Sequence, residues 1–252
     1  MTANPKAVVL LSGGMDSCVT AGIAAQTHSL SLVHASYGQR TAARERRAFD
    51  EIANFYGVSD RDRLVARLDY FAQIGGSALT DSSIAVPERA ARAIRGAVRG
   101  TVRGAVRGTA ADSAGEIPAT YVPFRNAHFL SVAVSWAEAI GAGSVWIGAV
   151  AEDSSGFPDC RPEYYRAFQE LLRVGTRPET RIEIMTPVIH LRKSAIIRRG
   201  IDIGVPLHLT WSCYQNDDQA CGSCDSCLLR LSAYAEAGVD DPIRYRTGVA
   251  PY

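Results

Sequence analysis

The sequence predicts an α/β protein with a Rossmann-like parallel sheet covered by helices on both faces. Apolar runs with β-branched residues at 6–11 and 30–36 flank an alanine-rich segment with helical spacing, 18–28. Strands that alternate with helices in this way form parallel sheets, because each helix carries the chain back across the sheet. Ligands of such sheets bind beyond the carboxyl ends of the strands, so the polar segments after the strands are the candidate sites.

The same alternation continues along most of the chain. Helices are expected at 41–56, 126–140, 162–174 and 193–203, and strands at 64–68, 144–150 and 182–188. Gly204 should end the helix before it, and Asn126 could cap the helix that it begins. Pro206 then interrupts the pattern, so we expect a main domain over 1–206, which carries the candidate sites after the strands, and a small helical C-terminal tail over 207–252, which carries the cysteine-rich segment.

The segment 12–17, SGGMDS, follows the first predicted strand and precedes the first helix. Its two glycines let the backbone turn tightly, and Ser12 and Ser17 add hydroxyl groups. If a helix begins at Asp16 or Ser17, its unpaired N–H groups and positive dipole end point at the same place, as in a phosphate site. An ordinary turn is the alternative. The lysine of the GxxxxGKS/T loop is absent, which excludes a P-loop of that kind.

Four cysteines near the C-terminus have the spacing C-x7-C-x2-C-x2-C, namely Cys213, Cys221, Cys224 and Cys227. Four thiolates make a closed tetrahedral site, which favours a structural zinc ion. An iron–sulfur cluster is the competing interpretation, because CxxCxxC also occurs in cluster ferredoxins. Disulfides are disfavoured, since the N-terminal segment reads as a first strand rather than an export signal and a cytoplasmic protein is expected.

The overall charge gives no reason to expect nucleic acid or a membrane as a partner. The chain has 27 Lys and Arg against 26 Asp and Glu, a formal net charge of +1. The longest apolar window, 129–151, contains Glu138 and is split at 141–143 by two glycines. It therefore reads as a helix followed by a buried strand rather than as a membrane span.

One insert, 93–108, has the sequence AIRGAVRGTVRGAVRG and fits no globular pattern. Glycine at every fourth position weakens a helix by about 1 kcal/mol each relative to alanine, and the arginines repel one another. We expect a mobile, solvent-exposed loop. An arm that contacts RNA or phosphate is the alternative, because arginine-glycine segments bind nucleic acid with little sequence preference.

Two polar clusters, 121–126 and 152–161, fall where loops should follow strands. The planar guanidinium of an arginine suits a carboxylate or phosphate, and carboxylates could accept hydrogen bonds from a purine-like edge or bind Mg²⁺. The candidate substrate-binding residues are Arg125, Asn126, Asp153, Asp159 and Arg161. Lys193 begins a later helix, where a compact ammonium group suits phosphates. Caps, turn residues and a surface lysine are the plain alternatives.

Seven segments together resemble the 7-cyano-7-deazaguanine synthase (QueC) family of the ATP pyrophosphatase, or PP-loop, superfamily. They are SGGMDS at 12–17, YGQR at 37–40, GSALTD at 76–81, VPFRN at 122–126, SGFPDCRPEYY at 155–165, TWSCYQ at 210–215 and CGSCDSCLLR at 221–230. The resemblance covers almost the whole chain outside the insert. It is specific, because other members of the superfamily share SGGxDS without the SGxPDCRP segment and a C-terminal four-cysteine site.

The resemblance implies an adenine nucleotide alpha hydrolase-type fold and an ATP-dependent ligase. Such an enzyme converts 7-carboxy-7-deazaguanine and ammonia to the nitrile preQ0, a queuosine precursor, through an adenylated carboxylate and an amide. It also implies Mg²⁺, one zinc per chain and a homodimer. We expect Asp16, Ser17 and Lys193 to be catalytic. The expected ATP contacts are Leu10, Leu11, Ser12, Gly13, Gly14, Met15, Asp16, Ser17, Cys18, Val19 and Thr20.

The sequence departs from the family pattern at Ser36, Thr41 and Ser154, where an acidic residue, a histidine and an aromatic residue are usual. These departures leave an alternative function open: the protein could be a diverged relative that stops at the amide, or one that transfers the activated carboxylate to another amine. A PP-loop enzyme that modifies tRNA is a further alternative, although no catalytic cysteine pair is evident. A non-enzymatic zinc-binding module would leave the first two hundred residues unexplained.

Overall fold

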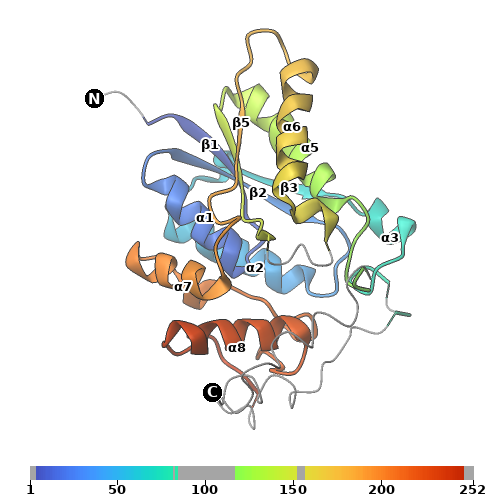
Figure 1. Cartoon of the computed structure of the whole chain (residues 1–252), viewed down its shortest axis with the longest axis vertical. Coiled ribbons are helices and arrows are strands. Elements are labelled where there is room, and N and C mark those ends of the chain that lie inside the picture. The colour runs from blue at the N-terminus through green and yellow to red at the C-terminus, as the bar shows by residue number, and fades with distance from the viewer. Residues whose placement is uncertain (1–3, 82, 85–116, 152–156, 247–252) are drawn as a thin grey trace.

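The computed structural model describes residues 4–81, 83–84, 117–151 and 157–246 (Figure 1). Within this part of the chain, a parallel five-stranded sheet has the order β3-β2-β1-β4-β5. The strands are β1 (Lys6–Leu10), β2 (Ser29–Ser36), β3 (Arg63–Arg67), β4 (Ser144–Ile147) and β5 (Glu183–Met185). The chain builds outward from β1 to β3, then returns to place β4 on the other side of β1. This reversal is the topological switch point of the sheet, and the predicted parallel α/β fold is confirmed.

The central strand β1 is apolar without alternation because both of its faces are covered. Ala7, Val9 and Leu11 belong to one buried core, and Val8 and Leu10 belong to another. The helices α1 (Met15–Ala25), α2 (Ala42–Phe55), α7 (Lys193–Asp202) and α8 (Asp225–Ala237) cover the first face, and α5 (Arg125–Ile140) and α6 (Pro162–Gly175) cover the second (Figure 1). The sheet is therefore sandwiched between two helical layers.

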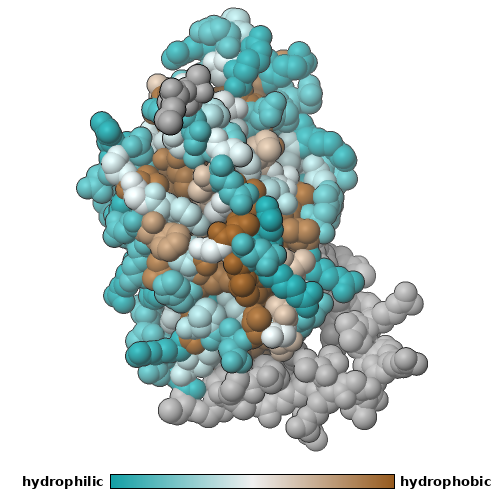
Figure 2. All heavy atoms as spheres, turned by 90° about the vertical axis from the view of Figure 1, so that its left-hand side faces the viewer, coloured by the Kyte–Doolittle hydropathy of each residue, from teal (hydrophilic) through white to brown (hydrophobic). Residues whose placement is uncertain are grey.

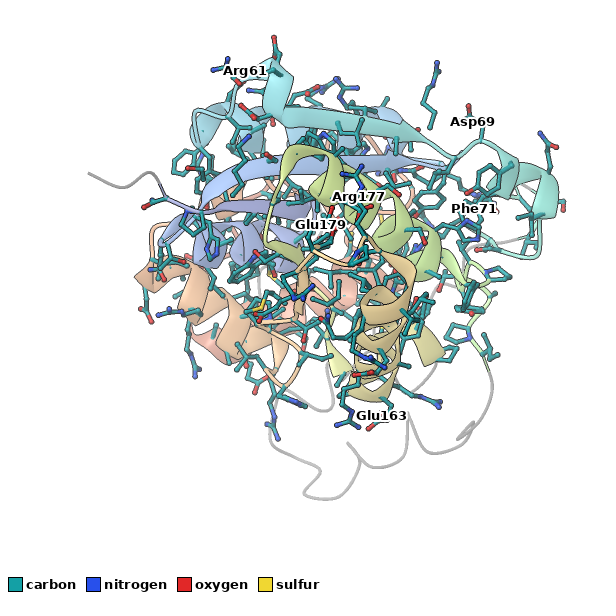
Figure 3. All side chains as sticks on the ribbon, turned by 90° about the horizontal axis from the view of Figure 1, so that it is seen from above. Arg61, Asp69, Phe71, Glu163, Arg177 and Glu179 are labelled. Carbon is teal, nitrogen blue, oxygen red and sulfur yellow. The ribbon has the colours of Figure 1, made fainter. Side chains whose placement is uncertain are left out.

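The carboxyl ends of the strands share one edge of the sheet. Seen from above in Figure 3, Arg61 lies beyond the amino end of β3, and Asp69 lies beyond its carboxyl end, next to the short helix α3 (Tyr70–Ile74). Since all strand pairs are parallel, the loops after β1, β2 and β4 emerge on the side of Asp69. The candidate site lies at this edge.

Several element boundaries differ from the prediction. Helix α1 begins at Met15, one residue before Asp16, because Gly14 has an extended backbone and is its N-cap. The strands β4 and β5 are shorter than the predicted 144–150 and 182–188. The short helix α3 was not expected, and α8 lies in the C-terminal unit that was expected to be helical, for which no helix bounds were predicted. Gly204, with φ of 70°, follows α7 closely as predicted.

The expectation that Asn126 caps its helix is wrong. Helix α5 begins at Arg125, after Phe124 in the left-handed conformation. The Asn126 side chain instead donates a hydrogen bond to the Asp159 carbonyl at 3.1 Å, and the Asn126 backbone N–H donates to Asp159 Oδ2 at 3.2 Å. The carboxylate of Asp159 therefore satisfies an N–H in the first turn of α5.

The C-terminal segment packs closely against the rest of the molecule. Helix α8 lies beside α7, and its Ala233 and Tyr234 belong to the same core as β1 and α1 (Figure 1). A separate small core joins Ala48 of α2 to Trp211 and the cysteines. The division of the chain at residue 206 stays a prediction, and the arginine-glycine insert lies outside the described residues.

The window 129–151 is a helix followed by a strand, as predicted, with Gly141 in the left-handed conformation between them. In the described part of the chain, no helix combines the length and hydropathy that a membrane span needs. Figure 2 shows a largely hydrophilic face in which some apolar side chains gather near the centre. Apolar side chains on such a surface are ordinary in folded proteins.

Candidate active site

The loop between β1 and α1 is held by its own hydrogen bonds. Ser17 Oγ donates to the Gly14 carbonyl at 2.9 Å and accepts from the Ser12 N–H at 3.2 Å. Gly13 has φ of 91°, and a Cβ there would lie 2.8 Å from the Glu45 carbonyl oxygen. Only glycine fits at this position, because both the backbone conformation and the space forbid a side chain. The loop is therefore already shaped in the free protein.

The N-terminus of α1 faces the edge of the sheet without a side-chain cap, because its N-cap is Gly14. The end of β4 approaches this first turn closely: a Cβ on Gly148 would lie 2.7 Å from the Asp16 carbonyl and from the Ser17 nitrogen. Uncapped N–H groups and the positive end of the helix dipole make such a helix start suitable for an anion.

Lys193, the first residue of α7, reaches the same place. Its Nζ lies 3.0 Å from Asp16 Oδ2, and both side chains are about one-fifth exposed. Asp16 Oδ1 is buried and accepts no hydrogen bond from the described residues. An unsatisfied carboxylate oxygen beside an anion-binding helix start fits an oxygen-seeking cation such as Mg²⁺.

A cavity of about 370 Å³ opens above these residues, within the usual range for small-molecule sites. It is lined by the loop, the ends of β2 and β4, the start of α5, Lys193 and the segment 211–214. The predicted ATP contacts that line it are Leu10, Leu11, Ser12, Gly14, Met15, Asp16 and Ser17. Gly13 lies against α2 instead, and Cys18, Val19 and Thr20 are fully buried within α1.

Arg125 lines the cavity from the start of α5. Its guanidinium carbon lies 5.5 Å from the centre of the Tyr37 ring and 5.6 Å from that of Phe129, and its Nη1 donates to the Tyr37 hydroxyl at 3.0 Å. Burial raises the pKa of the Tyr37 phenol to about 12, so the hydroxyl stays protonated. The two rings and the hydroxyl fix a cationic fork that suits a carboxylate.

The other predicted substrate-binding residues do not all line the cavity. Asn126 lines the cavity, with Cys160 beside its amide at 3.9 Å. Asp159 is buried in the 3-10 turn Pro158–Cys160 and is outside the cavity lining, as is the exposed Arg161 at the N-cap of α6. Asp153 lies outside the described residues, as does Ser154.

Three further cavity residues form a network that the sequence reasoning missed. Gln39 Oε1 accepts the Tyr37 N–H at 2.8 Å, and its Nε2 donates to Glu45 Oε2 at 2.9 Å. Thr41 Oγ1 donates to Glu45 Oε1, also at 2.9 Å. Burial raises the pKa of Glu45, opposed by these two hydrogen bonds. The four-residue spacing of Thr41 and Glu45 just after YGQR was the available signal.

The four predicted metal ligands come together. The Sγ atoms of Cys213, Cys221, Cys224 and Cys227 all lie within 4.8 Å of one another. The Cys221 and Cys227 sulfurs are 3.8 Å apart, and sulfurs around a tetrahedral zinc with bonds of about 2.3 Å would be separated by about 3.8 Å. The cluster therefore fits a metal ion bound by four thiolates.

Backbone N–H groups prepare these sulfurs for metal binding. Gln215 and Cys221 each donate to Cys213 Sγ at 3.4 Å, and Cys224 donates to Cys221 Sγ at 3.3 Å. Hydrogen bonds from the Cys224 and Cys227 thiols, with those from the backbone, lower the pKa of the Cys213 thiol. Such donors stabilise the thiolate form that a metal requires.

The segment that carries the cluster also supports the loop. The backbone N–H of Trp211 donates to the Gly13 carbonyl at 2.8 Å. The Arg44 guanidinium lies 4.6 Å from the centre of the Trp211 indole ring. Arg230 of α8 donates to Thr210 Oγ1 at 2.8 Å and pairs with Asp241. The four-cysteine cluster is therefore connected to the cavity by packed residues.

The fold and site define an α/β protein with a preformed glycine loop, a lysine–aspartate pair and an arginine around one cavity at the switch point of its sheet. The chain belongs to the QueC family: the model described as "Queuosine biosynthesis protein QueC" matches residues 6–238. It is similar to relatives named 7-cyano-7-deazaguanine synthase, and it is an enzyme of this family.

Three of these relatives illustrate the similarity. The synthase of Acidobacterium capsulatum is 52% identical over 240 residues, covering 95% of this chain and 96% of the relative. That of Koribacter versatilis is 49% identical over 249 residues (97% and 95%), and that of Chlorobium phaeobacteroides is 51% identical over 242 residues (95% and 96%). A solved U34-tRNA thiolase from Methanococcus maripaludis has a TM-score of 0.44 and 12% identity, covering 93% of this chain and 66% of the thiolase, and no inference is drawn from it.

Proposed function

We propose that the chain converts 7-carboxy-7-deazaguanine and ammonia to 7-cyano-7-deazaguanine with ATP, as a C–N bond-forming ligase of queuosine biosynthesis. One observation supports this most directly. The loop at the start of α1, which suits phosphate, and Arg125, which suits a carboxylate, line the same cavity. The reaction requires that a carboxylate and the phosphates of ATP meet in one site, and the names of the relatives fit it.

The chemistry begins with a carboxylate, which is a poor electrophile. Its oxygen attacks the α-phosphorus of ATP, pyrophosphate departs, and ammonia then displaces AMP to give the amide. A second adenylation, on the amide oxygen, allows loss of AMP and protons to give the nitrile, so two ATP are used per product. The residues of the chain contribute mainly by positioning and by stabilising charge.

The residues proposed for these roles surround the cavity. The backbone and hydroxyls of 12–17 hold the departing pyrophosphate at the helix start. Lys193 neutralises negative charge that develops on the phosphates, and Asp16 keeps its ammonium group in place. Arg125 holds the substrate carboxylate, with Asn126 beside it. Asp153, Asp159 and Arg161 stay proposed substrate contacts on the chemistry of their side chains, and Asp159 and Arg161 lie outside the cavity lining.

Two metals complete the proposal. Mg²⁺ would be held near Asp16, whose buried Oδ1 suits it, and supplies neutralisation of phosphate charge. Zn²⁺ would be held by the four cysteines, where a closed set of ligands makes it structural rather than catalytic. We also propose that the enzyme is a cytoplasmic homodimer, as the family resemblance implies.

Incubation of the protein with 7-carboxy-7-deazaguanine, ATP, Mg²⁺ and ammonium, followed by mass spectrometry, tests the proposal. The expected products are the nitrile, AMP and pyrophosphate. Amide as the final product would replace the proposal with a ligase that stops one step earlier. Turnover that requires added tRNA would replace it with a tRNA-modifying enzyme.

A further inference from the structure

The carboxylate residue Glu45 lines the cavity and has no role in the function proposed above. Among the described residues that line the cavity, only Asp16 and Glu45 carry carboxylates, and Asp16 pairs with Lys193. The two groups that donate hydrogen bonds to Glu45, on Gln39 and Thr41, are neutral. The cavity therefore presents a negative charge that no bonded cation neutralises.

The orientation of this carboxylate is fixed. Gln39 accepts the Tyr37 N–H through Oε1, so its amide must turn Nε2 toward Glu45. Thr41 occupies the other carboxylate oxygen. Each oxygen of a carboxylate can accept two hydrogen bonds, so each Glu45 oxygen keeps one further acceptor position. The network holds the carboxylate in place while leaving it able to bind a donor.

Glu45 also lies beside the place where the carboxyl group would be activated. Its backbone carbonyl lies so close to Gly13 that a Cβ on that glycine would be 2.8 Å away. The charge of Arg125 also acts on the Glu45 carboxylate and lowers its pKa. The cavity is therefore lined by Glu45, by the loop proposed for pyrophosphate and by the arginine proposed for the substrate carboxylate.

We propose that Glu45 binds the ammonium ion and accepts its proton, delivering ammonia to the activated carboxyl carbon. This inference rests on the proposed function. Ammonium has no lone pair, so one N–H bond must break, with the proton going to a Glu45 oxygen. The nitrogen lone pair then forms the C–N bond, the bond from the carboxyl carbon to the AMP oxygen breaks, and a second proton leaves the nitrogen for water.

Burial supports this assignment because it raises the pKa of Glu45 and makes the carboxylate a better proton acceptor. The charged groups that face Glu45 are Arg125 from α5 and Asp217 from the C-terminal segment, which act on its pKa in opposite directions. A carboxylate could also read the N–H donors of the deazaguanine ring. The N1–H and 2-amino donors of the six-membered ring lie remote from the 7-carboxyl group, so a carboxylate beside the loop is better placed for the nucleophile than for this edge of the ring.

The test compares Glu45→Gln with Glu51→Gln, a matched change on the same helix whose side chain is 40% exposed and lies outside the cavity lining. Two half-reactions are measured. Exchange of labelled pyrophosphate into ATP, dependent on 7-carboxy-7-deazaguanine, reports activation of the carboxylate without ammonia. Product formation is then measured against ammonium and against hydroxylamine, which is largely uncharged near neutral pH and needs no proton acceptor before it attacks.

In Glu45→Gln we expect ammonium-dependent product formation to fall about 100-fold, as for loss of a general base, with an increased KM for ammonium. Pyrophosphate exchange and hydroxamate formation should stay within about threefold of the parent, as in Glu51→Gln. Unchanged ammonium kinetics in Glu45→Gln would overturn the inference. Loss of pyrophosphate exchange would also overturn it, because Glu45 would then bind the deazaguanine ring or ATP. Absence of exchange in the parent enzyme would instead reject the proposed function.

Discussion

Lys193 Nζ lies 3.0 Å from Asp16 Oδ2, although the two residues are 177 positions apart in the sequence. Lys193 is the first residue of α7, and Asp16 is in the first turn of α1. The pair therefore joins two helix N-termini at the carboxyl edge of the sheet. Two positive helix ends and an ammonium group would repel one another without the carboxylate between them.

Replacement of Lys193 with methionine should impair activation of the carboxylate. The apolar stem is kept while the charge near the proposed phosphate site is lost, so pyrophosphate exchange should fall about 10²–10³-fold. The chain has only two lysines, and the other, Lys6, is exposed at the start of β1. Lys6→Met is therefore the control. Equal exchange rates in the two variants would contradict the role given to Lys193.

Asp16→Ala should abolish AMP formation while leaving the metal content unchanged, because Asp16 bonds to Lys193 and is not part of the four-cysteine cluster. We expect a loss of at least about 10²-fold, the scale for one positioning group. The control is Asp50→Asn on the exposed side of α2, where Asp50 pairs with Arg46. Activity retained by Asp16→Ala would remove this residue from the mechanism.

The purified enzyme should contain one zinc per chain and no visible chromophore. Cys221→Ser should lose the metal, whereas Cys160→Ser, which lies outside the cluster, should keep it. If loss of the metal lowers the free energy of unfolding by about 3 kcal/mol, the Tm of a chain of this size should fall by roughly 6–12 °C. Metal analysis and thermal unfolding measure both effects. Stoichiometric iron with a brown colour would establish a cluster of iron and sulfur instead.

His34 should make the protein less stable as the pH falls below about 6.5. It is almost fully buried, its Nδ1 donates to the Leu11 carbonyl at 3.3 Å, and burial lowers its pKa from 6.5 to about 4. Between these values the unfolded chain binds more protons than the folded one, so the free energy of unfolding rises with pH. The full effect is at most about 3 kcal/mol.

Urea unfolding at pH values from 4 to 7.5 measures this dependence. In His34→Met, the increase in unfolding free energy with pH should be smaller by up to about 3 kcal/mol. The control, His190→Gln, removes an exposed histidine and should leave the slope of the parent. Parallel curves for His34→Met and the parent would show that His34 does not titrate in this range.

Replacing one partner of the buried ion pair of Arg230 and Asp241 should lower the free energy of unfolding strongly. Replacing both partners with apolar residues should lower it much less. Their side chains are 2% and 5% exposed, and Arg230 donates to both carboxylate oxygens at 2.7 and 2.9 Å. Arg230→Met alone should cost about 3–5 kcal/mol because it leaves Asp241 without its cation. The double variant with Asp241→Leu should recover most of that loss, and strict additivity of the two losses would contradict this account.

The order of strands and helices was predictable because each has a strong local pattern. The run that became β1 is apolar on both faces, the run that became β2 contains Leu30, Leu32 and Val33, and the segments that became α2 and α6 have helical spacing. Helix α8 lies in the tail that was expected to be helical, but its start was not predictable because its first turn contains Cys227 of the metal-binding pattern. Helix α3 is too short for a periodic pattern to indicate it.

The candidate site was predictable where its residues are close in sequence, as in the 12–17 loop and the cysteine cluster. The pairing of Asp16 with Lys193 was not, because it depends on how two helices converge. Asp159 shows the same limit: a carboxylate that the sequence suggests for a ligand is used by the start of α5. Glu45 was overlooked because its helix resembles an ordinary surface helix until the cavity beside it is known.

The hydrogen bond from Trp211 to Gly13 has a consequence for the order in which the enzyme is made. The strand, loop and helix of the phosphate site precede Trp211 along the chain, so they leave the ribosome before the residue whose backbone N–H bonds to the Gly13 carbonyl. Trp211 in turn shares a small core with the cysteines. A nascent chain therefore completes its site only after the segment that contains Trp211 has been synthesised.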